Sequence, residues 1–277
     1  MKKTLLTTAL LAATTLAQAH ELWVTSPATA SANSQISGEI GYGHNFPAGE
    51  PIATERLAIF KPLEIIGMDG KRYEMSQKGE NYQYLSKDKI PAGAYWLNAF
   101  YQPTFWSKNK DGWKMQNRKE MPDADTCILA QMYSKTLVVV GKPGRLDPAA
   151  LAKPLGNNLE IIPLADPTQL KADSILPLQI LYKGKPLFLA KVTATADTFV
   201  EKDLDAANEG RRPIAFSNVT GKDGKINVIL SGEGLWNIRV THNAPFEDEK
   251  TCMEHSNRSS LVVAVGSKRA AKHSHSD

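Results

Sequence analysis

The chain has 277 residues, of which 42% are hydrophobic and 22% are charged, and this composition suits a globular protein with a substantial core. Its formal net charge of +4 is too small to favour a nucleic-acid-binding protein. After the N-terminal segment, no stretch approaches about 18 consecutive apolar residues, so we expect no membrane span.

Residues 1–19 have the pattern of a secretory signal peptide. Lys2 and Lys3 form a charged start, a leucine-rich apolar run follows, and residues 17–19 read Ala-Gln-Ala, which matches an A-x-A cleavage site. We therefore expect cleavage between Ala19 and His20 and a soluble periplasmic product.

The predicted cleavage makes His20 the first residue of the mature chain. A terminal histidine carries a free α-amine and an imidazole, and both nitrogens can bind one borderline-soft metal ion. Metal binding is therefore our leading interpretation of His20. The alternative is a chance placement, because signal peptidase reads mainly the positions before the cleaved bond.

The rest of the chain reads as short β-strands separated by Gly, Pro, Asn and Asp. Strands are predicted at residues 36–42, 57–61, 72–75 and 82–85 in the first half, and at 159–164, 175–182, 191–196 and 225–230 in the second. Helical periodicity is limited to single turns at residues 147–152 and 204–208. This pattern predicts an all-β protein built from sandwiches.

A short internal repeat indicates that the two halves of the chain share one architecture. Residues 91–101 resemble residues 232–240, and each segment is followed by a cysteine and by a closing strand that ends in valine and glycine. The repeat predicts two tandem β-sandwich domains. We expect them at residues 20–143 and 159–266, with a linker at 144–158 and a disordered tail at 267–277.

Cys127 and Cys252 are the two cysteines of the chain, and an exported protein with two cysteines is expected to form one disulfide. Each precedes the closing strand of its half, so the bond would tie the halves together. The alternative is a pair of soft metal ligands.

Three further histidines are candidate metal ligands. His44 lies in a glycine-flanked turn after a predicted strand, His242 ends a strand, and His255 follows Cys252. None has a local metal-binding spacing, so a site would be assembled in space from His20, His44, His242 and His255. We rank His44 next to His20, because both belong to the first half.

Other motifs point away from catalysis. The sequence contains no glycine-rich phosphate loop, no G-x-S-x-G elbow and no H-E-x-x-H motif, so we expect no enzyme. The segment 102–126 is rich in aromatic residues, and we expect it to cap the edge of the first sandwich.

Several motifs resemble a family of exported bacterial proteins linked to nickel and cobalt uptake. They are His-Glu-Leu-Trp at residues 20–23, Gly-His-Asn-Phe at 43–46, and the runs at 134–138, 159–167, 184–187 and 236–242. Members are often described only as a domain of unknown function, or as the periplasmic component beside an energy-coupling-factor nickel transporter. The second half also resembles the carboxypeptidase-regulatory, prealbumin-like sandwich, which implies immunoglobulin-like or prealbumin-like domains.

The resemblance implies a periplasmic protein that captures a nickel or cobalt ion and hands it to a membrane permease. It points most strongly to His20 and His44, and less to His242, as metal ligands. Two alternatives stay open: a copper oxidase with a histidine brace, and a β-sandwich module that binds protein or glycan without metal. Residue types alone do not name the metal, because copper binds such sites more tightly than nickel.

Overall fold

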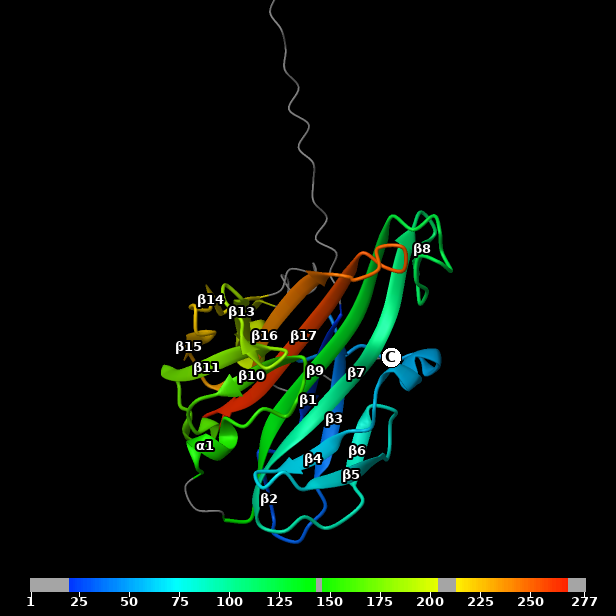
Figure 1. The fold of residues 1–277 in the computed structure, drawn as a ribbon. Helices are drawn as coiled ribbons and strands as arrows, with labels where there is room; N and C mark the ends of the chain where they lie inside the picture. Colours follow the sequence, from blue (N-terminus) through cyan, green and yellow to red (C-terminus); the bar gives the residue numbers. More distant parts are fainter. Residues whose placement is uncertain (1–19, 143–145, 204–212, 269–277) are drawn as a thin grey trace, which may run out of the picture.

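The computed structural model describes residues 20–142, 146–203 and 213–268, and β-strands dominate it, which confirms the predicted all-β class (Figure 1). The predicted signal peptide, the predicted helical turn at 204–208 and most of the predicted tail lie outside the described residues. Within the described ranges, no helix has the length and hydropathy needed to cross a membrane.

The strands of the first half surround one core. They are β1 (Glu21–Thr25), β2 (Thr29–Ala30), β3 (Ser37–Gly43), β4 (Glu64–Gly67), β5 (Arg72–Gln77), β6 (Gln83–Ser86), β7 (Gly93–Asn109), β8 (Gly112–Lys114) and β9 (Thr126–Val140). One long sheet runs from β1 through β3, β6, β5 and β4 to β7 and β9. The backbone N–H of Val24 in β1 donates to Ser134 Oγ in β9 at 2.9 Å, so this sheet curls until its first strand lies over β9.

The second half is a sandwich of two sheets. Its strands are β10 (Leu159–Pro163), β11 (Ser174–Tyr182), β12 (Lys185–Pro186), β13 (Lys191–Ala196), β14 (Phe216–Val219), β15 (Lys225–Leu230), β16 (Gly234–Pro245) and β17 (Glu254–Val265). β10, β11, β12 and β15 form a separate sheet, which packs over β13, β16 and β17.

The two halves share one sheet, because β9 pairs in parallel with β17. The antiparallel pairs β7–β9 and β16–β17 therefore lie side by side across the centre of the molecule (Figure 1). The prediction of two tandem domains stays a prediction, and the continuous sheet means that the two halves are in extensive contact.

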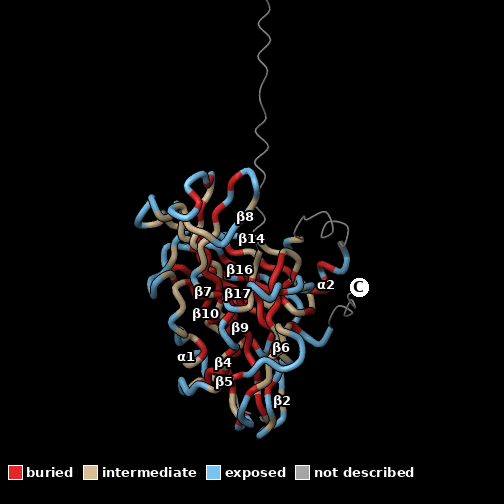
Figure 2. Tube along the Cα trace, turned by 90° about the vertical axis from the view of Figure 1, so that its right-hand side faces the viewer, coloured by how far each residue is buried: buried red, intermediate tan, exposed pale blue. Residues whose placement is uncertain are grey.

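The two faces of β7 and β9 belong to different cores. Tyr95 and Leu97 pack in the first core, whereas Trp96, which points to the other face, packs with Trp236 and Ile161 in the second. Figure 2 shows the buried residues gathered along these central strands and the exposed ones on the outer loops. Because successive side chains of β7 point to opposite faces, this one strand contributes residues to both cores.

The internal repeat corresponds to a similar hydrogen bond, from an aromatic side chain to a backbone carbonyl, in each half. Tyr95 Oη donates to the carbonyl of Pro91 at 3.0 Å, and Trp236 Nε1 donates to the carbonyl of Gly232 at 2.9 Å. Each bond spans four residues at the start of a long strand. The repeat read from the sequence thus corresponds to β7 and β16, which occupy similar places in their halves.

One local prediction is wrong. Residues 57–61 are not a strand: they lie mostly in a 3₁₀ helix (Thr54–Ile59), where the N–H of Phe60 bonds to the carbonyl of Leu57 at 3.1 Å. The expectation that segment 102–126 caps the first sandwich stays a prediction: β7 continues to Asn109 and returns through β8 and β9, and Trp106 packs against the first core.

The remaining helices are single turns: α1 (Pro148–Leu151), α2 (Asp197–Val200) and 3₁₀ turns at Pro167–Gln169 and Glu201–Asp203. α1 confirms the turn predicted at 147–152. The Asp147 side chain accepts a hydrogen bond from the N–H of Ala149, and Leu151 is buried in the second core.

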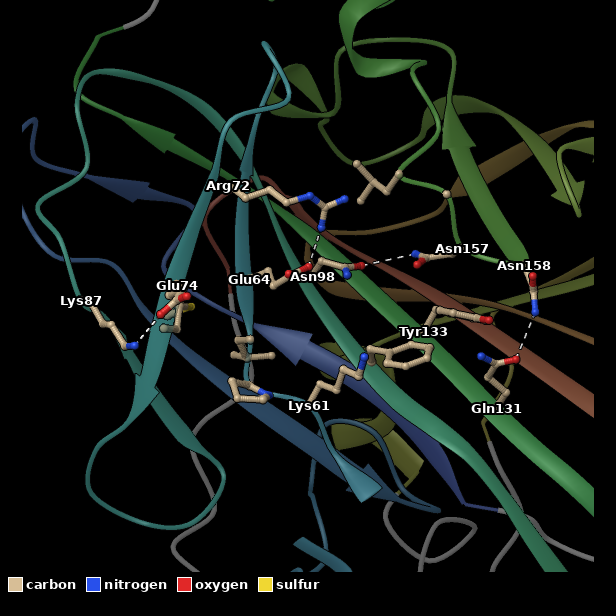
Figure 3. A pocket seen from close by; sticks show the side chains of 16 residues that line it. Lys61, Glu64, Arg72, Glu74, Lys87, Asn98, Gln131, Tyr133, Asn157 and Asn158 are labelled. Atoms are coloured by element: carbon tan, nitrogen blue, oxygen red, sulfur yellow. Dashed lines mark hydrogen bonds and ion pairs between the residues drawn. The ribbon is translucent and has the colours of Figure 1, made fainter. Parts of the chain in front are cut away.

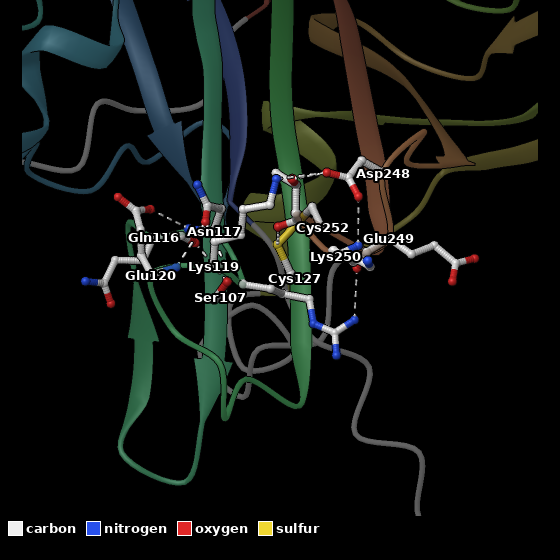
Figure 4. The surroundings of a disulfide bond; sticks show 12 residues. Ser107, Gln116, Asn117, Lys119, Glu120, Cys127, Asp248, Glu249, Lys250 and Cys252 are labelled. Atoms are coloured by element: carbon white, nitrogen blue, oxygen red, sulfur yellow. Dashed lines mark hydrogen bonds and ion pairs between the residues drawn. A yellow bond between two sulfur atoms is a disulfide. The ribbon is translucent and has the colours of Figure 1, made fainter.

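The predicted disulfide between Cys127 and Cys252 is present, and its Cα atoms are 5.1 Å apart (Figure 4). Cys127 lies in β9, and Cys252 lies just before β17. Contacts around the bond join the loops that precede β9 and β17: the N–H of Arg118 donates to the carbonyl of Thr251 at 2.9 Å, and Lys119 Nζ lies 3.0 Å from Asp248 Oδ2. The disulfide therefore fastens the parallel β9–β17 pair at the end where both strands begin.

A buried ion pair connects β9 to β10, the first strand of the second half. Lys135 Nζ in β9 lies 3.3 Å from Glu160 Oε1 in β10, and both side chains are at most 3% exposed. Burial lowers the pKa of Lys135, whereas the carboxylate of Glu160 raises it. Glu160 also accepts hydrogen bonds from the N–H groups of residues 155–157. The carboxylate therefore organises the loop that precedes β10.

We expect Glu160→Gln to lower the free energy of unfolding by about 3 kcal/mol, because it leaves the Lys135 charge buried without its counter-ion. Urea denaturation followed by tryptophan fluorescence measures the change. Glu64→Gln is the matched control, since Glu64 pairs with Arg72 at the surface and its loss should cost less than about 1 kcal/mol. Equal stability losses in the two variants would contradict this account.

Candidate metal centre

His20 and His44 meet at one end of the β1–β3 ladder. The antiparallel register places Glu21 opposite Gly43, so the residues flanking that pair reach the same edge. Their ring centroids are 4.2 Å apart. Gly43 has φ +147°, and a Cβ there would lie 2.9 Å from Glu50 Cγ, so glycine permits the turn that follows.

The turn after β3 brings Glu50 back against both histidines. The N–H of Glu50 donates to the carbonyl of Tyr42 at 2.7 Å, which fixes the returning backbone. Glu50 Oε1 accepts the N–H of His44 at 2.9 Å and lies 2.6 Å from His44 Nδ1, while Oε2 lies 3.0 Å from His20 Nε2. One carboxylate thus bridges two imidazoles.

The surroundings of His20 favour a neutral ring. The imidazole stacks on Tyr42 with centroids 4.7 Å apart and an interplanar angle of 10°. Burial lowers the pKa of His20, electrostatic repulsion by His44 lowers it further, and Glu50 opposes both effects. A neutral imidazole is the form that binds metal ions.

Glu50 is held in its charged form. Burial raises the pKa of its carboxyl, but the hydrogen bonds from the ring and backbone of His44 outweigh that effect and leave the pKa below its usual value. The cluster therefore combines a carboxylate with an imidazole biased toward its neutral form.

The spacing of these groups suits a metal ion. One ligand atom each of His20, His44 and Glu50 lies within 4.8 Å of the others. Bonds of about 2.0–2.2 Å to nitrogen and oxygen place neighbouring ligand atoms about 3 Å apart. The two contacts of Glu50 with the rings, 2.6 and 3.0 Å, are close to that separation. The three side chains could therefore hold a divalent cation once their ligand atoms turn toward one point.

The chelate that we expect from the sequence and the cluster in the structure use different ring nitrogens of His20. A chelate ring with the α-amine uses Nδ1, whereas Nε2 faces Glu50 in the structure. In the full chain the His20 nitrogen is a peptide amide, and cleavage after Ala19 would convert it to an amine. A site that includes the amine requires the imidazole ring to rotate, whereas a site of three side chains uses the ring as it lies.

The start of β1 is anchored by the second half of the chain. Arg258 Nη1 in β17 donates to the carbonyl of His20 at 2.8 Å, and Arg239 Nη1 in β16 lies 2.8 Å from Glu21 Oε2. Ser260 Oγ donates to the carbonyl of Leu22 at 2.8 Å. The position of His20 therefore depends on both halves.

The structure does not bring His242 and His255 to this cluster. Arg258 and Ser260 contact β1, and successive residues of a strand point to opposite faces, so His255 lies on the other face of β17. His242 lies on the same far face, with its ring 4.3 Å from that of Tyr182. Burial lowers the pKa of both histidines.

Sequence reasoning missed Glu50. The signal that could have found it is the turn itself: residues 43–50 read Gly-His-Asn-Phe-Pro-Ala-Gly-Glu, and a proline and two glycines favour a chain reversal that returns the acid to the histidine. The reversal is present, and Asn45 and Ala48 form an isolated antiparallel bridge within it.

Comparison with known proteins places this chain in a family. No curated protein matches it. A family model described as a domain of unknown function, DUF4198, matches residues 17–244, which include β1, the Glu50 turn and most of the second half. The chain therefore belongs to the DUF4198 family.

Proposed function

We propose that this protein acts in the periplasm, after removal of residues 1–19, and that His20, His44 and Glu50 bind a nickel or cobalt ion for delivery to a membrane uptake system. The observation that carries the proposal is the convergence of three ligand atoms within 4.8 Å at the predicted mature terminus. The disulfide between Cys127 and Cys252 is compatible with an oxidising compartment.

The donor types support a divalent ion of intermediate softness. Imidazole nitrogens suit nickel, cobalt, copper and zinc, and the Glu50 oxygen adds a harder ligand. Both cysteines are consumed in the disulfide, so the chain offers no thiolate for copper(I). The choice of nickel or cobalt within this group rests on the resemblance described above.

Partial exposure of the cluster supports capture and release. The side chains of His20, His44 and Glu50 are 29%, 23% and 44% exposed. A closed structural metal site is surrounded by protein ligands, whereas an open position permits ligand exchange. A partner protein could therefore reach the ion without unfolding of the turn.

The first test concerns the α-amine. We expect protein that begins at His20 to bind nickel at least about tenfold more tightly than protein with one extra N-terminal glycine, because the extension converts the amine to an amide. Isothermal titration calorimetry compares the two forms. Equal affinities would remove the amine from the site and leave the three side chains as its ligands.

A copper oxidase would instead consume oxygen in the presence of copper and a reductant.

The second test concerns the side chains. We expect Glu50→Gln and His44→Ala each to weaken nickel binding at least about tenfold, which corresponds to about 1.4 kcal/mol. Lowering the pH should weaken binding by the wild type, because protons compete for His20, His44 and Glu50.

His242→Ala is the matched control for these variants, because its ring lies on the opposite face of the sheet beside Tyr182. It should bind nickel as the wild type does. Normal binding by Glu50→Gln together with a loss in His242→Ala would contradict the proposed site.

A further inference from the structure

A cleft with a volume of about 650 Å³ lies away from the metal cluster (Figure 3). β4, β5 and residues 61–63 form one side, and residues 155–158, which precede β10, form the other. Its floor is the face of β7 and β9 that carries Asn98, Phe100, Gln131 and Tyr133. A volume of this size accommodates a small organic molecule.

Two amide side chains in the floor have NH₂ groups that donate no hydrogen bond to the protein among the described residues. Asn98 and Gln131 are each 7% exposed. Asn98 Oδ1 accepts from Asn157 Nδ2 at 3.4 Å, and Gln131 Oε1 accepts from Asn158 Nδ2 at 3.2 Å. Within the described residues, neither NH₂ group of Asn98 or Gln131 donates a hydrogen bond to the protein. These donors are therefore open to a ligand that carries acceptors.

The charges around the cleft favour an anion. Glu64 pairs with Arg72 at 2.7 Å and Glu74 pairs with Lys87, so both acids are neutralised. Lys61 has no acidic partner among the described residues, and its Nζ lies 5.2 Å from the centroid of Phe100. The lining therefore keeps one uncompensated positive charge, at Lys61.

Aromatic rings cover part of the floor. Phe100 and Tyr133 lie with centroids 5.3 Å apart, and burial raises the pKa of Tyr133 to about 12, so its hydroxyl stays protonated. Such rings provide an apolar surface for a planar or ring-shaped group. The opposite wall is fixed, because Glu160 accepts the N–H groups of residues 155–157.

We propose that this cleft binds a small organic carboxylate with a ring or planar portion, whose carboxylate pairs with Lys61 and whose ring lies against Phe100 and Tyr133, between the amides of Asn98 and Gln131. Charge-assisted hydrogen bonds of this kind are stronger than neutral ones. A neutral sugar would accept hydrogen bonds from the amides but would form no ion pair with Lys61. The Lys61 charge therefore favours an anionic ligand over a neutral one. The inference goes beyond the proposed function and is independent of the metal ion.

The probe is 4-fluorobenzoate, compared with its neutral analogue 4-fluorobenzamide, in ¹⁹F NMR titrations of metal-free protein. We expect saturable binding of the benzoate, at least tenfold weaker binding of the benzamide, and shifts of the side-chain amide signals of Asn98 and Gln131. Lys61→Met should weaken benzoate binding at least tenfold, since it removes the charge and keeps the exposed stem. Lys110→Met, in the exposed β7–β8 turn, should have no effect.

Absence of saturable benzoate binding, equal affinity for the two probes, or unchanged binding by Lys61→Met would overturn the inference. Because the titrations contain no metal, their result says nothing against nickel binding at His20. Preferential binding of methyl glucoside over benzoate would also overturn it and would identify a neutral sugar as the ligand class.

Discussion

The parallel pairing of β9 with β17 is the constraint on which the rest of the structure depends. It joins the curled sheet of the first half to the sandwich of the second, and the Cys127–Cys252 bond fastens its beginning. β1 lies over the joined strands, held by Ser134 from one half and Ser260 from the other. The predicted mature terminus is therefore positioned by residues that are far apart in the sequence.

This arrangement gives the two faces of the shared sheet different chemistry. On the face covered by β1, a carboxylate bridges two imidazoles at a partly exposed turn. On the other face, β7 and β9 contribute amides and aromatic rings to a larger cleft, whose wall depends on the Lys135–Glu160 pair. The sheet thus separates the groups proposed to bind a metal ion from those proposed to bind a carboxylate.

Much of the fold could be predicted because its signals are local. Turn residues and alternation located most of the strands, and the repeat identified β7 and β16 as equivalent. The β9–β17 pairing could not be predicted, since no local pattern specifies which distant strands become neighbours. The same limit applies to the site: His20 and His44 lie on strand ends that pair, but the far-face position of His255 depends on the register of β17 and on which face β1 covers.

The central claim is that His20, His44 and Glu50 hold a divalent metal ion at the mature N-terminus. Anomalous diffraction at the nickel absorption edge, from crystals of protein that begins at His20 and contains nickel, tests it most directly. The account predicts one strong peak about 2.0–2.2 Å from atoms of all three residues. A peak beside His242 and His255, with none at the Glu50 turn, would contradict it.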